Sequence, residues 1–284
     1  MATKKFELKS DMAEKVQKVA NVKKVTVISF VAPLNPVRVS PSETARAVIT
    51  EKEMFELEGY VKKSKSSELH FVIHTPGGEL FTSYKIAAYL RNKFKKIDMF
   101  VPYRAASGGT LICCAANSIY MGDLANLTPV DPQTYYAKNY VSAYAFERAV
   151  DQFHESFGEL SPDEIPSPYQ QMASKFDPII LDEMNRLVSC TLWYANDLLE
   201  QSGYEEMRAW RLATQIVKTS RPHPHAFLKQ DTKKLGFEVK EDDETMNVYS
   251  ELVSACLKAE STSHVIKAFY PESPASKPNI KRQK

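Results

Sequence analysis

Apolar and polar positions alternate in blocks along the first half of the chain. Residues 25–32, 69–74 and 97–102 are short apolar runs rich in β-branched and aromatic side chains, which is typical of buried strands. Between them, residues 43–63 and 80–94 carry apolar side chains at helical spacing. The order strand, helix, strand, helix, strand predicts an α/β fold built on a parallel sheet.

The pattern continues beyond this first block. Residues 111–117 are small and apolar, which predicts a buried helix, and residues 118–122 predict another strand. Residues 142–210 are mainly helical in pattern, with a break at the proline-rich stretch 161–168 that predicts a loop. A last strand and helix are expected between residues 237 and 259.

Length and composition favour one folded domain. The chain has 284 residues, of which 43% are hydrophobic and 25% charged, as in an ordinary globular protein. We assign residues 1–20 to an N-terminal extension, residues 21–260 to the main domain and residues 261–284 to a C-terminal tail whose end is disordered. A net charge of +2 gives no electrostatic reason to expect nucleic acid or a membrane surface as partner.

Neither a leader, a membrane span nor a metal site is expected. The first twenty residues contain no continuous apolar core, and nothing later approaches the roughly 20 apolar residues that a membrane helix needs. The four cysteines lack metal-ligand spacing, and no Cys/His cluster accompanies them. We therefore expect a cytoplasmic protein with no metal and no cofactor.

Four of the nine glycines form two adjacent pairs. Gly77 and Gly78 follow the predicted strand 69–74, and Gly108 and Gly109 follow Ser107. Each pair therefore lies at the carboxyl end of a strand and before a helix, where open α/β sheets bind their ligands. Glycine lets the backbone turn sharply and leaves N–H groups uncovered.

This arrangement suggests a nucleophile beside an oxyanion hole. Ser107 on a tight strand-to-helix bend has the placement that a nucleophilic hydroxyl needs. The amides of Gly77, Gly78 and Gly108 are then candidates to stabilise the oxyanion of an acyl-transfer reaction. The simpler alternative is that Ser107 caps a helix and that both glycine pairs form ordinary turns.

The two motifs and their order resemble a known family. The runs "FVIHTPGG" (71–78), "AASGGT" (105–110) and "IYMGDLANLTPVDPQ" (119–133) are similar to the Clp/crotonase superfamily. Within it, the chain looks most like the serine dehydrogenase proteinase family, which is related to signal peptide peptidase A, and the resemblance spans roughly residues 20–271. It implies a spiral of repeated β-β-α units with a parallel sheet and outer helices.

The resemblance also implies an activity. Ser107 would be the nucleophile of an ATP-independent serine peptidase that cleaves peptides or unfolded proteins. Homo-oligomers that enclose the site are common in the superfamily, so a homo-oligomer is expected here.

The general base is harder to assign. Clp-type peptidases carry a histidine about one strand and a turn beyond the serine, but this chain has Asp131 near that spacing. The signal peptide peptidase relatives use a lysine, and Lys175 occupies the most similar position, with Lys138 as the second candidate. Asp131 would orient either lysine or cap a turn, and the simpler reading of Lys175 is a solvated side chain at a helix start.

Three histidines are weaker candidates. His74 precedes the first glycine pair, and a histidine at a strand end is more often structural than catalytic. His223 and His225 flank Pro224 where family members carry a different pattern, so the resemblance transfers no role to them.

Two other functions stay open at this stage. An acyl-CoA hydratase or isomerase on the same fold would use the two amides to hold a thioester enolate, but it would need no serine at the bend. An inactive oligomeric scaffold would fit the absence of the Clp-type histidine.

Overall fold

The structure is a computed structural model that describes residues 6–34, 47–136, 139–259, 261 and 263–272. Lys138 therefore lies outside the described residues. The helices are α1 Ser10–Lys23, α2 Glu51–Val61, α3 Leu80–Lys93, α4 Gly108–Cys113, α5 Ala143–Phe157, η1 Pro162–Glu164 (a 3-10 turn), α6 Ser167–Ala173, α7 Pro178–Gln201, α8 Glu206–Val217, α9 Lys229–Leu235 and α10 Asp243–Leu257. The strands are β1 Thr26–Val31, β2 Glu68–His74, β3 Lys96–Val101, β4 Arg104–Ala105, β5 Ser118–Met121, β6 Asn126–Leu127, β7 Gln133–Tyr136, β8 Asn139–Ser142, β9 Phe227–Leu228, β10 Val239–Lys240 and β11 Val265–Phe269.

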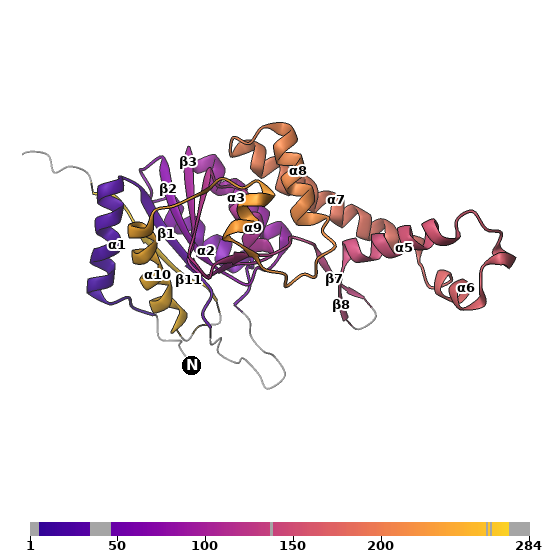
Figure 1. Cartoon of the computed structure of the whole chain (residues 1–284). Helices are drawn as coiled ribbons and strands as arrows, with labels where there is room; N and C mark the ends of the chain where they lie inside the picture. The colour runs from indigo at the N-terminus through magenta and orange to yellow at the C-terminus, as the bar shows by residue number, and fades with distance from the viewer. Residues whose placement is uncertain (1–5, 35–46, 137–138, 260, 262, 273–284) are drawn as a thin grey trace, which may run out of the picture.

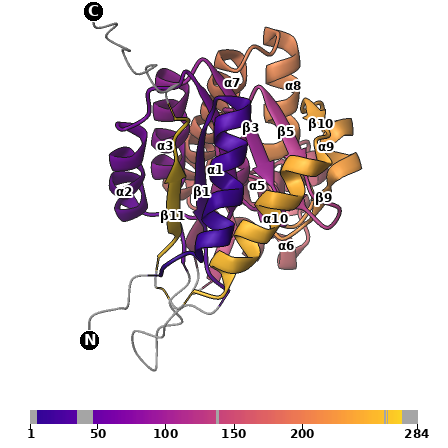
Figure 2. The same ribbon diagram turned by 90° about the vertical axis from the view of Figure 1, so that its left-hand side faces the viewer.

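The centre of the fold is a six-stranded sheet in the order β10-β5-β3-β2-β1-β11. All neighbouring strands are parallel except β11, which runs antiparallel to β1. Figure 2 shows α1 and α10 side by side across one face of this sheet, with α2 and α3 on the other face. These features confirm the predicted α/β class with a parallel-rich sheet and flanking helices.

Each strand supplies both faces with apolar side chains. In β1, Ile28 and Phe30 join the core beneath α2 and α3, whereas Val27 and Val31 join the core beneath α1 and α10. Because side chains alternate between the faces of a strand, a continuous apolar run is what a sheet covered on both faces requires.

A second, small sheet stands beside the carboxyl end of the first. It has the order β4-β6-β9, with β4 parallel and β9 antiparallel to β6. β3 belongs to the large sheet, β4 to the small sheet, and α4 follows directly. In this β-β-α succession the chain bends at Ser107, which lies between the end of β4 and the first residue of α4.

Both ends of the described chain pack on the main sheet. Helix α1 buries Met12, Val16 and Ala20, and β11 completes the sheet edge beside β1. Residues 1–20 and 261–284 were expected outside the main domain. In the structure, α1 buries apolar side chains against the sheet and β11 is hydrogen-bonded to β1, so both belong to the same folded unit.

Helices α5 and α6 and the start of α7 project from the body as an arm, defined here as residues 143–183 (Figure 1). Ser142 caps α5 by accepting a hydrogen bond from the Ala145 amide, and Asp177 caps α7. Ala143 is the only residue of the arm that is buried. The stretch 161–168, expected as a loop, contains η1 and begins α6.

Candidate active site

The two glycine pairs meet because β4 extends alongside the residues that follow β2. The Thr75 amide donates to the Arg104 carbonyl, and the Ala106 amide donates to the Thr75 carbonyl, both at 3.0 Å. Thr75 precedes the first glycine pair by two residues, and Ala106 precedes Ser107 by one. The expected neighbourhood of the two turns is therefore present in the structure.

Glycine is required at both positions of the first pair. Gly77 has φ +98°, and a Cβ built on it would lie 2.6 Å from the Ala106 carbonyl oxygen and 2.9 Å from the Ser107 Cβ. A Cβ on Gly78 would lie 2.2 Å from the Ile49 backbone nitrogen. These contacts show that the glycine turn lies against the serine turn with no room for a side chain.

Ser107 has a strained backbone at the bend between β4 and α4. Its φ is +50° and its ψ −114°, although it is not glycine. Such conformations cost about 1–3 kcal/mol and gather at functional sites. Its amide donates to Thr128 Oγ1 at 2.8 Å, which fixes the bend, and its side chain is half-buried.

The three predicted oxyanion donors differ in their present partners. The Gly77 amide donates to Thr75 Oγ1 at 3.1 Å. Within the described residues, the amides of Gly78 and Gly108 have no acceptor. A Cβ on Gly108 would lie 3.4 Å from the Gly78 nitrogen, so these two free N–H groups are close neighbours beside Ser107.

Two buried histidines lie behind the first glycine pair. His264 Nε2 is 2.8 Å from Thr75 Oγ1, and burial lowers the pKa of His264 from 6.5 to about 3. Burial also lowers the pKa of His74 to about 4, with a smaller contribution from the positive charge of Arg104. Both rings are therefore neutral at pH 7. Sequence reasoning missed Thr75 and His264, which are 189 residues apart.

Lys175 is not brought to the serine within this chain. Its side chain is exposed and makes no hydrogen bond or ion pair with the described residues. It follows α6, which Figure 1 shows at the outer end of the arm, away from the sheet. Its role as general base stays a prediction.

Asp131, in contrast, has a histidine partner. His223 Nδ1 lies 2.6 Å from Asp131 Oδ1, and the other carboxylate oxygen accepts a hydrogen bond from Gln133 Nε2 at 2.9 Å. The Asp131 side chain is 4% exposed and that of His223 is 34% exposed. Nothing in the sequence pattern pairs these two residues, which are 92 positions apart.

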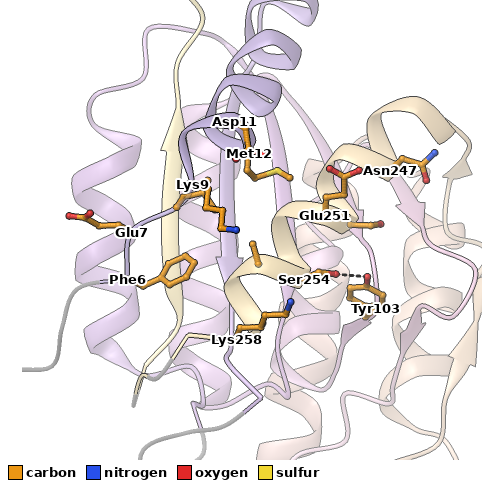
Figure 3. Close-up of a pocket in the computed structure, with 13 residues that line it drawn as sticks. Phe6, Glu7, Lys9, Asp11, Met12, Tyr103, Asn247, Glu251, Ser254 and Lys258 are labelled. Carbon is orange, nitrogen blue, oxygen red and sulfur yellow. Dashed lines mark hydrogen bonds between the residues drawn. The ribbon is translucent and has the colours of Figure 1, made fainter.

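A cavity of about 810 Å³ lies elsewhere, between the N-terminal segment and α10. Figure 3 shows Phe6 and Lys9 on one side of it and Glu251, Ser254 and Lys258 on the other. Neither Ser107 nor the glycine pairs line this cavity, and we give it no part in the chemistry of Ser107.

No group of three metal-binding side chains occurs among the described residues. In the same part of the chain, no helix is both long and apolar enough to cross a membrane.

Ser107 thus lies on a strained strand-to-helix bend beside two backbone amides that have no acceptor among the described residues. Residues 46–155, which include both glycine pairs and Ser107, match the family model of ClpP-like SDH-type serine proteinases. This is the family that the sequence motifs resemble, and its recognition is confirmed on this segment.

Two uncharacterized proteins of Methanocaldococcus jannaschii are also similar to the chain. One is 28% identical over 178 residues, covering 62% of this chain and 54% of the relative. The other is 25% identical over 171 residues, covering 60% of this chain and 51% of the relative. The chain thus spans about half the length of the curated relatives that it matches.

Among solved structures, the chain is similar to the 1510-N membrane-bound stomatin-specific protease. A mutant of that protease in complex with a substrate peptide shows 15% identity and a TM-score of 0.44, over 69% of this chain and 73% of the protease. A second mutant shows 14% identity and a TM-score of 0.45, over 76% and 88%.

Proposed function

We propose that this chain is an ATP-independent serine peptidase in which Ser107 attacks the carbonyl of a peptide bond. The observation that carries the proposal is the strained Ser107 bend beside the free amides of Gly78 and Gly108. A positive φ at a serine is otherwise unfavourable, and here it presents the hydroxyl at the end of the sheet where ligands bind.

The amides of Gly78 and Gly108 are proposed to hold the oxyanion of the tetrahedral intermediate. An oxyanion donor contributes about 2.7–4 kcal/mol where it has been tested. Gly77, whose amide is engaged by Thr75, would shape the loop that presents Gly78. The family match supports a peptidase over an acyl-CoA enzyme, which would have no use for Ser107.

The substrate is proposed to be a peptide or an unfolded protein, because the site is built around main-chain amides that recognise a carbonyl and not a particular side chain. A homo-oligomer is also proposed. Several large apolar side chains are solvent-exposed on α6 and α7, namely Met172 at 52%, Ile179 at 74% and Trp193 at 56%. Exposed apolar surface of this kind often marks association surfaces, and light scattering of the purified chain would measure the assembly.

The compartment is proposed to be reducing. All four cysteines are free thiols, and buried free thiols are usual in the cytoplasm.

The decisive experiment measures casein cleavage without nucleotide, together with labelling by a fluorophosphonate probe. We expect the intact chain to cleave casein and to take up one probe per chain, and Ser107→Ala to do neither. Ser174→Ala is the matched control, because Ser174 is an exposed serine on the arm whose hydroxyl donates only to a neighbouring carbonyl. Folded protein that neither cleaves nor takes up the probe would contradict the proposal and favour the scaffold alternative.

A further inference from the structure

The Asp131–His223 pair lies beyond the ends of two strands of the small sheet, and the serine bend lies beyond the end of the third. In β6 and β9, Leu127 pairs with Phe227 in an antiparallel ladder. Asp131 lies four residues after Leu127, and His223 lies four residues before Phe227. Because the strands are antiparallel, these two residues lie opposite each other beyond the paired positions. The 2.6 Å contact between His223 Nδ1 and Asp131 Oδ1 joins them there.

Ser107 lies two residues after the neighbouring strand of the same sheet, β4. Ala105 of β4 pairs with Leu127 of β6 in parallel, so Ser107 and Asp131 both follow the carboxyl ends of neighbouring parallel strands. The Ser107 amide donates to Thr128 Oγ1 at 2.8 Å, which ties the serine bend directly to the loop that carries Asp131. Ser107 and Asp131 thus follow β4 and β6, and His223 precedes the antiparallel β9, so that all three lie beyond the same end of the small sheet.

The hydrogen bonding fixes the tautomer of His223. A carboxylate only accepts, so Nδ1 of His223 carries the proton and donates it to Asp131 Oδ1. The lone pair of the neutral ring is then on Nε2, on the side opposite to Asp131. Pro222 and Pro224 flank the histidine and restrict its backbone, and Gln133 holds the second carboxylate oxygen.

We propose that His223 is the general base for Ser107 and that Asp131 is the residue that positions it. This inference rests on the proposed peptidase function and assigns the base that the sequence left open. The order along the chain is serine, aspartate, histidine, and the geometry is that of a base whose second nitrogen is held by a buried carboxylate.

The proposed reaction balances with these groups alone. Ser107 Oγ attacks the carbonyl carbon while its proton passes to His223 Nε2, and the oxyanion forms at the amides of Gly78 and Gly108. The C–N bond then breaks, and the leaving nitrogen takes the proton from His223. Water next gives a proton to His223 as its oxygen attacks the acyl ester, and the C–O bond breaks with return of that proton to Ser107 Oγ.

His225 provides a matched control two residues away. Its Nε2 lies 2.7 Å from Arg221 Nη1. Arginine only donates, so the lone pair on His225 Nε2 is already occupied. No carboxylate holds its ring in the described structure, unlike that of His223.

The test compares the kcat and KM of peptide hydrolysis for His223→Asn, Asp131→Asn and His225→Ala. The asparagine amide at position 223 can still donate to Asp131 from the place of Nδ1, so the fold is kept while the base is lost. We expect kcat to fall about 100- to 10,000-fold in His223→Asn with little change in KM. His225→Ala should stay within about twofold of the intact chain.

Two further readouts separate catalysis from packing. Added imidazole should restore part of the kcat of His223→Ala and none of that of Ser107→Ala. The low-field proton signal of a histidine Nδ1–H bonded to a carboxylate should be present in the intact chain and absent from both His223→Asn and Asp131→Asn.

The failure of this inference is distinguishable from the failure of the peptidase function. If Ser107→Ala is inactive while folded His223→Asn retains full kcat, or if Lys175→Ala loses activity and His223→Asn does not, the assignment of His223 is wrong and the peptidase stands. If Ser107→Ala retains full activity, the proposed function itself falls.

Discussion

His264 Nε2 lies 2.8 Å from Thr75 Oγ1, and this contact fastens β11 and the segment before it to the glycine turn. The same hydroxyl oxygen accepts the Gly77 amide at 3.1 Å. Thr75 is fully buried and His264 is 2% exposed. The Thr75 hydroxyl thus connects the segment before the edge strand β11 to the loop that presents Gly78.

Replacing Thr75 by Val should therefore loosen the glycine turn. Valine keeps the shape but leaves the Gly77 amide and the His264 ring nitrogen without a partner, and each unsatisfied buried group costs about 1–3 kcal/mol. We expect the free energy of unfolding to fall by about 2 kcal/mol or more, and the rate of fluorophosphonate labelling to fall about tenfold. Thr75→Ser, which keeps the hydroxyl, should label close to the original rate. Equal labelling rates for the valine and serine variants would show that the hydroxyl does not hold the turn.

Gly78→Ala should disrupt the site, whereas Gly59→Ala should not. A Cβ at Gly78 would meet the Ile49 backbone at 2.2 and 2.3 Å, and backbone atoms cannot move aside cheaply. Gly59 lies inside α2 with nothing within 4 Å of its Cβ position, so alanine there should stabilise the chain by up to about 1 kcal/mol. Chemical denaturation measures both effects, and a Gly78→Ala variant as stable as the intact chain would refute the packing argument.

At position 107, glycine should give a more stable fold than alanine, which is the reverse of the usual order. Alanine normally gives a more stable fold than glycine, because glycine has more conformational freedom to lose. At φ +50° and ψ −114° alanine carries the backbone strain and glycine does not. We expect Ser107→Gly to be about 1–2 kcal/mol more stable than Ser107→Ala, with neither variant active. Urea denaturation of the two variants side by side decides the sign.

Acid should destabilise the fold through three buried histidines. Burial lowers the pKa of His70 and His74 from 6.5 to about 4, and that of His264 to about 3. Near His70, Asp98 Oδ2 is 3.8 Å from Nε2 but is shared with Lys96 Nζ at 3.1 Å, so burial dominates.

Below pH 6.5 the three histidines bind protons in the unfolded chain but stay neutral in the folded chain. The free energy of unfolding is therefore highest above pH 6.5 and should fall by roughly 1 kcal/mol per pH unit per histidine as the pH decreases toward about 4. Urea titrations between pH 7 and 4.5 measure the slope. His70→Asn, which can still bond to the Tyr249 hydroxyl from the place of Nδ1, should make it shallower. A flat profile over this window would contradict the assignment.

The sequence predicts the main sheet well because its strands are buried on both faces. The run 69–74 falls within β2, and the helical pattern 80–94 corresponds to α3 at Leu80–Lys93. Continuous apolar runs and helical spacing are local signals, and tertiary contacts here reinforce them. By contrast, β4, β6 and β9 have two residues each, which is too short for any periodicity.

The candidate site also contains parts with a local sequence signal and parts without one. The bend at Ser107 and the two glycine turns can be predicted because glycine reveals the local backbone conformation directly. The Asp131–His223 contact joins residues 92 positions apart, through a small sheet that no pattern indicates. A signal was nevertheless present, because Asp131 stands near the spacing of the Clp-type histidine and His223 lies between two prolines.

Lys175 marks the limit of local reasoning, and its role as general base stays a prediction. Its place between two helical patterns matches that of a base in related enzymes, but helical patterns do not fix the direction in which helices leave the body. Here α5 and α7 carry the segment outward along the arm.

The arm also has a small aromatic centre of its own. The ring of Phe176 lies edge-on to Phe146 at 5.9 Å, and the rings of Phe153 and Phe157 lie 5.0 Å apart, tilted by 50°. Almost every side chain around them reaches solvent. With so little buried area joining it to the sheet, this segment should open and close as a separate unit. Its amide hydrogens would then exchange with deuterium well before those of β1, β2 and β3, while the site at Ser107 keeps its geometry throughout.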